Sequence, residues 1–240
     1  MLRITDARTG ELVDAAPARR GLTRVEAHPR ALDPTGLRVL LAADLLVRAL
    51  ELGGTPVWAL LAAEGRHAEL RAAADALGIR PFEDGAGAAG LGEAQVLHVV
   101  DEGGDEPDGL RVAVAPVTWS AAGAPEETDQ AALRLALLTH PRNAPAVIDA
   151  DALERAGETL RRWRGAVADW ARRPSRPVPD EVRAELRDAW EDDLDTAAVL
   201  GALRAVETDP ALPDGARFET YAYADRLLGL DLARDLGHPA

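Results

Sequence analysis

The chain contains neither cysteine nor lysine, and this absence limits how its fold can be held together. Without cysteine it can form no disulfide and no thiolate zinc site, so a hydrophobic core must supply its stability. Its 240 residues, 47% of them hydrophobic, are enough to bury such a core. The same absence excludes a cysteine nucleophile, a lysine Schiff base and a P-loop lysine.

The charge of the chain narrows the choice of partner. A formal net charge of −14 disfavours binding to a nucleic-acid backbone. The longest apolar stretch, residues 39–52, includes Asp44, Arg48 and Glu51, which argues against a membrane span. No early segment has the pattern of a signal peptide. We therefore expect a soluble cytoplasmic protein whose partner is a small molecule or another protein, in an oligomeric state that the sequence leaves open.

In the first half, strand patterns alternate with helix patterns. We expect strands at residues 22–28, 56–61, 95–100 and 110–117, and helices at residues 35–52 and 66–77. A strand–helix–strand order predicts parallel pairing with right-handed crossovers. Residues 1–21 and 82–93 are rich in turn-forming or small residues, and we expect them to be irregular.

After residue 128 the sequence predicts helices alone. They are expected at residues 129–139, 149–172, 180–193, 196–208 and 218–228, with Asp149 or Asp151 capping the second. The predicted fold class is α/β followed by all-α. It comprises a reduced Rossmann-like parallel-sheet domain over residues 1–128 and a helical bundle over residues 129–240.

Three motifs of the helical half occur in a specific order. They are residues 132–138 (ALRLALL), 160–164 (LRRWR) and 189–198 (AWEDDLDTAA). In order and spacing they resemble the stem and helical bundle of class I cysteinyl-tRNA synthetases and of the related cysteine ligase of mycothiol synthesis. The first half resembles this family less specifically, through Asp44, Arg48, the glycine pair 53–54 and residues 76–81.

This sequence departs from the family pattern at the zinc site and at both ATP-binding motifs. The family's zinc site uses two cysteines, a histidine and a glutamate, so it cannot form here and zinc is not expected. Residues 33–36 (DPTG) replace the His-Ile-Gly-His signature that binds ATP. Residues 118–128 (TWSAAGAPEET) replace the Lys-Met-Ser-Lys-Ser loop and supply two carboxylates and no cation. The chain is also much shorter than the family enzymes.

These losses shape the expected function. Adenylation needs fixed donors and cations for the departing pyrophosphate, and losing one donor can cost on the order of 10²–10³ in rate. We therefore expect no catalytic residue, no tRNA binding, and a catalytically degenerate paralogue that binds a nucleotide, a metabolite or a protein partner. The alternatives are a divergent ATP-dependent ligase, another biosynthetic enzyme on this fold, or a subunit that a partner chain completes.

Four residues are candidates for an inherited ligand cleft. Thr35 and Gly36 begin a predicted helix, where backbone amides and the helix dipole can hold an anion or nucleotide. His28 and His98 fall at or near the carboxyl ends of predicted strands, where open α/β sheets bind ligands. With the acids at 101–102 these histidines could hold a metal. The spacing is not diagnostic, and we expect partly buried histidines beside loop acids instead.

The second half offers a basic patch and an acidic motif. Six arginines surround Trp163 and Trp170, as suits contact with a polyanion or a protein. They are Arg161, Arg162, Arg164, Arg172, Arg173 and Arg176. We favour the alternative, a helix whose tryptophans pack inward. In residues 192–196 we expect Asp195 or Thr196 to cap the next helix, which gives the acids a structural role.

Overall fold

The computed structural model describes residues 1–18, 21–63, 65–84, 93–103, 108–120 and 129–237. Its first half is built on a five-stranded sheet in the order β5-β4-β3-β6-β7, and every pairing is parallel. The strands are β3 (Leu22–His28), β4 (Val57–Leu61), β5 (Glu83–Asp84), β6 (Glu93–Asp101) and β7 (Leu110–Val114). Helices α1 (Pro34–Leu52) and α2 (His67–Ala76) connect the first three strands along the chain. The predicted α/β class is confirmed.

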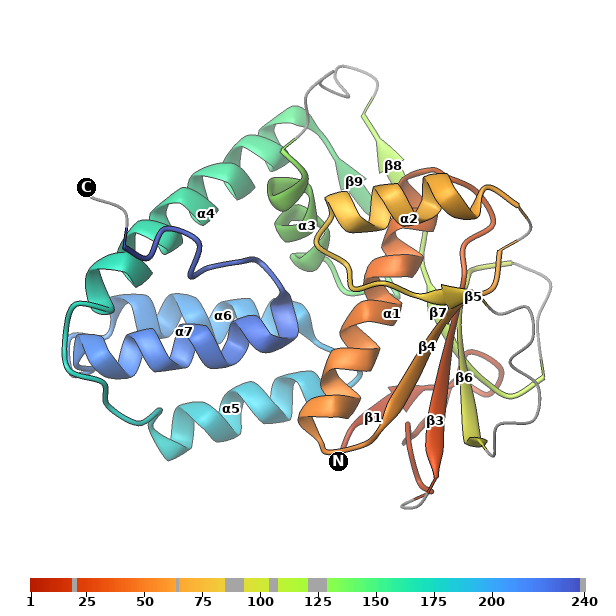
Figure 1. Cartoon of the computed structure of the whole chain (residues 1–240), viewed down its shortest axis with the longest axis horizontal. Helices are drawn as coiled ribbons and strands as arrows, with labels where there is room; N and C mark the ends of the chain where they lie inside the picture. Colours follow the sequence, from red (N-terminus) through yellow and green to blue (C-terminus); the bar gives the residue numbers. More distant parts are fainter. Residues whose placement is uncertain (19–20, 64, 85–92, 104–107, 121–128, 238–240) are drawn as a thin grey trace.

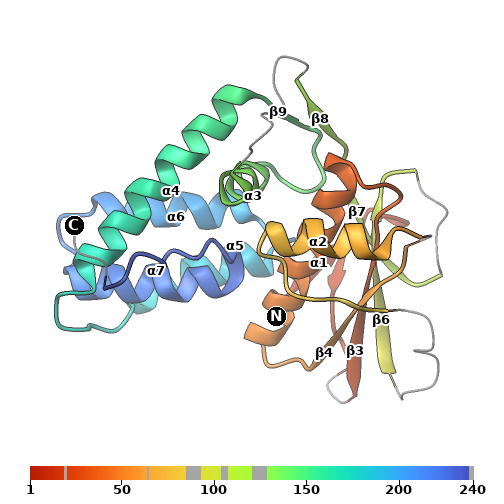
Figure 2. The same ribbon diagram turned by 45° about the horizontal axis from the view of Figure 1, so that its top comes forward.

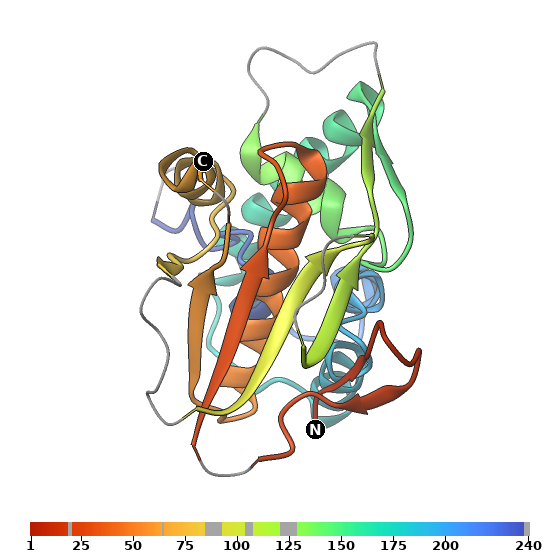
Figure 3. The same ribbon diagram turned by 90° about the vertical axis from the view of Figure 1, so that its right-hand side faces the viewer.

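Each central strand presents its apolar residues to α1. Val25 and Ala27 of β3 and Leu97 and Val99 of β6 are fully buried on that face. Since side chains alternate along a strand, the residues between them point to the opposite face. Figure 3 views the sheet from that opposite face, with α1 behind the strands.

The second half is a group of helices beside the α/β layer (Figures 1 and 2). They are α3 (Gln130–Leu138), α4 (Ala150–Trp170), α5 (Asp180–Glu191), α6 (Thr196–Thr208) and α7 (Asp214–Leu228). Trp163 and Trp170 of α4 pack edge-on against the ring of Tyr221 from α7. The predicted C-terminal helices and their inward-facing tryptophans are confirmed. Among the described helices, none combines the length and the apolar character that crossing a membrane requires.

Five short strands were not expected. One is β5, which pairs in parallel with β4, so the prediction of an irregular segment at residues 82–93 is wrong at Glu83–Asp84. β1 (Arg3–Thr5) and β2 (Leu12–Asp14) form an antiparallel pair, so the prediction of an irregular lead-in is wrong there. β9 (Ala146–Ile148) pairs in parallel with β8 (Val117–Trp119), so the prediction of helices alone after residue 128 is wrong at β9. Three residues are too few to show a hydrophobic period. The proposed boundary at residue 128 lies outside the described residues, and the β8–β9 pair joins its two sides.

The acidic motif at residues 192–196 has a structural role. Asp195 caps α6 by accepting a hydrogen bond from the amide of Ala198 at 2.9 Å. The Asp193 carboxylate accepts hydrogen bonds from the amide and hydroxyl of Thr5, at 2.8 and 3.0 Å, and also pairs with Arg142. The motif therefore starts one helix and fastens β1 to the helical half.

A buried ion pair joins the two halves. Arg134 of α3 and Asp44 of α1 are each 1% exposed, and their charged groups lie 2.8 Å apart. The remaining nitrogens of Arg134 donate to the carbonyls of Leu228 at 2.7 Å and Leu77 at 3.1 Å. Arg48 donates to the same Asp44 oxygen at 2.8 Å. A planar guanidinium with five hydrogens can hold several oxygens at once, so one side chain ties together three segments of the chain.

A second buried arginine also holds several backbone carbonyls. Arg38 of α1, 3% exposed, donates to the carbonyls of Ala115, His140, Pro141 and Ala144. Burial lowers the pKa of Arg38 to about 10, so the side chain remains charged at neutral pH. The three hydrogen bonds to residues 140–144 fix the loop after α3 against the first turns of α1, and the bond to Ala115 fixes the segment between β7 and β8.

Replacing Arg134 by methionine should leave the Asp44 carboxylate buried beside fewer cations. We expect a loss of about 3–5 kcal/mol in the free energy of unfolding, the usual cost of breaking a buried pair. Chemical denaturation of wild type and variant measures it. The double variant Asp44→Leu/Arg134→Met should recover part of the loss, while Arg161→Ala on the exposed side of α4 should change little. A single variant as stable as wild type would contradict this role.

Candidate functional site

The register of the central strands brings three ionisable side chains together. Glu26 of β3 and His98 of β6 are paired positions, and His28 lies two residues beyond Glu26 on the same face. This is the sheet face directed away from α1, because Val25 and Ala27 take the helix side. The site therefore follows from strand alternation and parallel pairing.

Each of the three side chains directs one nitrogen or oxygen atom toward the other two. His28 Nε2 lies 3.0 Å from His98 Nδ1, and Glu26 Oε2 lies 3.0 Å from that His98 nitrogen and 3.4 Å from His28 Nε2. The side chains are 15% exposed at Glu26, 24% at His28 and 7% at His98. The cluster is thus largely enclosed, and His28 is its most accessible member. Among the described residues these groups lie close enough together to hold one metal ion.

Arg24 completes the charge arrangement. Its Nε lies 3.0 Å from Glu26 Oε1, which leaves Oε2 facing the histidines. Hydrogen bonds from His28 and then His98 outweigh burial, and with the charge of Arg24 they hold the pKa of Glu26 well below its usual range. At neutral pH the cluster therefore contains an ionised carboxylate beside two imidazoles, which can exchange protons or bind a cation.

The structure gives Thr35 and Gly36 other partners. The amide of Gly36 donates to the Asp33 carboxylate at 2.8 Å, which caps α1. The Thr35 hydroxyl accepts a hydrogen bond from the amide of Val117 at 3.0 Å. A Cβ on Gly36 would lie 2.0 Å from the carbonyl oxygen of Ala31, so the preceding loop packs directly on this turn. An anion at this helix start would meet a carboxylate already in place.

The acids expected beside the histidines lie elsewhere. Asp101 ends β6 and lies 3.8 Å from Arg30, and burial raises its pKa. The carboxylate that joins His28 and His98 is Glu26. The sequence carried a signal for it, since Glu26 and His28 are two apart in a predicted strand and must share a face. The sequence did not show which residue of β6 would lie opposite.

The predicted basic patch is divided in the structure. Arg164 is 8% exposed and donates to the carbonyls of Leu230 and Asp231 at 2.7 and 3.1 Å. Arg162 pairs with Glu207 at 2.8 Å. Arg172 and Arg173 lie 3.7 Å from Asp169 and Asp214, and Arg161 and Arg176 are exposed. Much of this positive charge is thus compensated nearby, and binding of a polyanion here stays a prediction.

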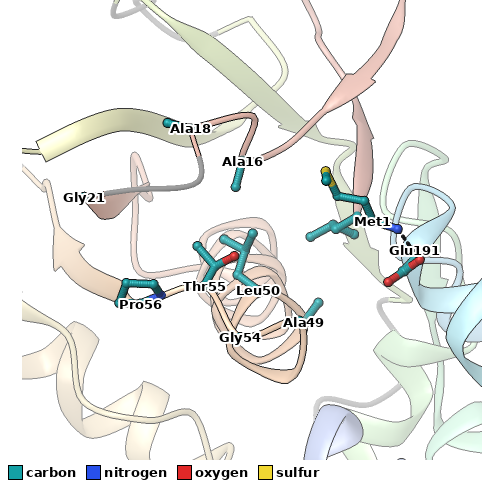
Figure 4. A pocket seen from close by; sticks show the side chains of 12 residues that line it. Met1, Ala16, Ala18, Gly21, Ala49, Leu50, Gly54, Thr55, Pro56 and Glu191 are labelled. Carbon is teal, nitrogen blue, oxygen red and sulfur yellow. Dashed lines mark hydrogen bonds and ion pairs between the residues drawn. The ribbon is translucent and has the colours of Figure 1, made fainter.

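A cavity of about 320 Å³ lies at the opposite, amino-terminal edge of the sheet (Figure 4). Its wall is formed by small and apolar residues such as Ala16, Ala49 and Leu50, by Gly54, and by Glu191. Parallel α/β sheets bind ligands at their carboxyl edge. Among the described residues that line it, the one carboxylate, Glu191, is paired with the amino group of Met1, so this cavity is a weaker candidate than the three-residue cluster.

Comparison with known proteins confirms the predicted resemblance to the cysteine ligases. No family model matches the chain. An L-cysteine:1D-myo-inositol 2-amino-2-deoxy-alpha-D-glucopyranoside ligase of Streptosporangium roseum is 37% identical over 115 residues, which cover 45% of this chain and 26% of the ligase.

Proteins of the same description from Parafrankia sp. and Frankia alni are 46% and 44% identical over 77 and 87 residues. These matches cover 32% and 36% of this chain and 16% and 20% of those ligases. The similarity thus spans about a quarter or less of the relatives' length.

The cap at the start of α1 can be tested directly. Asp33→Ala should lower the free energy of unfolding by about 1 kcal/mol, because the amide of Gly36 loses its acceptor. Asp33→Ser should retain most of the stability, since a serine hydroxyl also accepts from this position. Equal stabilities of wild type and Asp33→Ala in urea denaturation would show that the carboxylate does not occupy this helix start.

Proposed function

We propose that this chain is a ligase-like protein that has lost amino-acid activation and works as a binding module, with its ligand at the carboxyl edge of the sheet, on the face directed away from α1. The observation that carries the proposal is the start of α1. There the Asp33 carboxylate takes the amide hydrogen that an anionic ligand would need. A helix N-terminus attracts anions only while its amides and positive dipole end are available.

The charges near this helix start support the same conclusion. Asp101 raises the local negative charge beside Asp33, and Arg30 is the nearby exposed cation that pairs with it. The buried Arg38 is committed to four carbonyls and cannot turn toward a phosphate. Two carboxylates near a triphosphate repel it, so this edge favours a ligand that carries little negative charge or a positive one.

Such a ligand is a small polar metabolite or a segment of a protein partner. The groups that could contact it are Glu26, His28 and His98, which combine one negative charge with two imidazoles that donate or accept hydrogen bonds. Their partial exposure lets a ligand reach them without a rearrangement of the core.

The alternative is a divergent ATP-dependent ligase. It is favoured by identities of 37–46% to proteins named as cysteine ligases. Against it stand the short matched length and the sequence at residues 33–36 and 118–128, where the resembling family places its ATP signatures.

A measurement of amino-acid activation distinguishes the binding module from the ATP-dependent ligase. In ATP–pyrophosphate exchange with cysteine and the other amino acids, we expect this chain to give no turnover above background. Among the described residues, the exposed cation near the start of α1, Arg30, is paired with Asp101, and Arg38 is committed to backbone carbonyls, so the departing pyrophosphate lacks a fixed cation. The Streptosporangium roseum ligase serves as the positive control. Robust exchange with any amino acid would overturn the binding-module proposal.

Thermal stability gives an independent readout. A ligand that binds the folded state raises the melting temperature with its concentration above Kd. We expect no concentration-dependent shift with ATP, adenylate analogues or tRNA, and a shift with the metabolite or partner that occupies the carboxyl edge. An increase of the melting temperature that saturates with ATP concentration would contradict the proposal that Asp33 occupies the start of α1.

A further inference from the structure

We propose that Glu26, His28 and His98 form a binding site for one divalent transition-metal ion of the zinc class. The three ligand atoms are Glu26 Oε2, His28 Nε2 and His98 Nδ1, and they converge on one point of the sheet face directed away from α1. The proposal does not depend on the proposed function, because metal binding can be measured whether or not the chain activates amino acids.

The spacing of these atoms matches a metal coordination shell. Ligands held at about 2.1 Å from zinc stand about 3.4 Å apart in a tetrahedral site and about 3.0 Å apart in an octahedral one. The observed separations are 3.0 Å between the histidine nitrogens, and 3.0 and 3.4 Å from them to the carboxylate oxygen. An ion therefore requires adjustments of only about 0.4 Å.

Hydrogen bonds can satisfy two of the three contacts at once but not all three. Each imidazole nitrogen presents either a hydrogen or a lone pair, and the ionised Glu26 only accepts. If both nitrogens carry hydrogens, two donors face each other at 3.0 Å. If one nitrogen is bare, its lone pair meets the lone pair of Glu26 Oε2. A cation between the three groups attracts all of these lone pairs at once.

The surroundings hold the ligands in position. Arg24 engages Glu26 Oε1 and leaves Oε2 for the ion. The backbone of Gly109 lies against the His98 ring, where a Cβ would stand 3.3 Å from Nε2, and Gly109 has a φ of +129° that favours glycine. Contacts that orient the ligands of a metal contribute to its affinity.

The donor set indicates the class of ion. Two imidazoles with one carboxylate suit zinc, cobalt, nickel or iron, whereas magnesium and calcium prefer oxygen ligands. Three protein ligands also leave a coordination position for water or for a donor atom of a small molecule. The site is thus of the open type, reached from the side of His28.

Metal titration tests the proposal on the whole chain after chelator treatment. We expect one equivalent of Zn²⁺ by calorimetry and one of Co²⁺ by visible absorption, where the absence of cysteine excludes thiolate bands. His98→Gln and the nearly isosteric Glu26→Gln should each weaken binding at least about tenfold. Circular dichroism and melting temperature establish that each variant is folded, and Glu26→Gln decides the question if His98→Gln is not.

A matched control uses the other histidines of the chain, which has five. The triple variant His67→Gln/His140→Gln/His238→Gln should bind one equivalent with the affinity of wild type. The proposal is overturned if wild type shows no saturable binding, if folded Glu26→Gln binds as tightly as wild type, or if the triple variant loses the site.

Discussion

The guanidinium of Arg134 lies where α1, α3, the end of α2 and the end of α7 meet, and the arrangement of the two halves depends on it. It neutralises Asp44 and holds two backbone carbonyls in a region almost without solvent. A buried charge without its partner is costly, so neither residue is easily replaced alone. The backbone after α7 packs closely against the guanidinium of Arg134, since a Cβ on Gly229 would stand 2.8 Å from Arg134 Nη2.

The motifs that resemble the ligase family are the ones that make such contacts. Arg134 lies in the segment ALRLALL, Trp163 in LRRWR is fully buried against Tyr221, and Asp193 and Asp195 of DDLDT fasten β1 and cap α6. The contacts that these residues make hold the fold together. Residues 33–36 and 118–128 depart from the resembling family, so the resemblance at these packing motifs is evidence for the fold rather than for activity.

The sequence predicted the long elements well because their hydrophobic pattern repeats over many residues. The bounds of β3 and α6 were predicted to the residue, while three-residue strands such as β9 gave no period to detect. His28 and His98 were predicted near strand ends, but Glu26 was missed because its position depends on the register between β3 and β6. Arg164 was included in the possible basic patch because periodicity does not reveal which arginine donates to buried carbonyls.

The central claim is that ligands bind at Glu26, His28 and His98, on the sheet face directed away from α1, and not at the start of α1. Anomalous diffraction at the zinc edge, from crystals soaked with Zn²⁺ and ATP together, tests both parts in one measurement. The account predicts an anomalous peak between Glu26, His28 and His98 and no nucleotide density beside Asp33. Triphosphate density at Thr35 and Gly36, with no peak at the three-residue cluster, would contradict it.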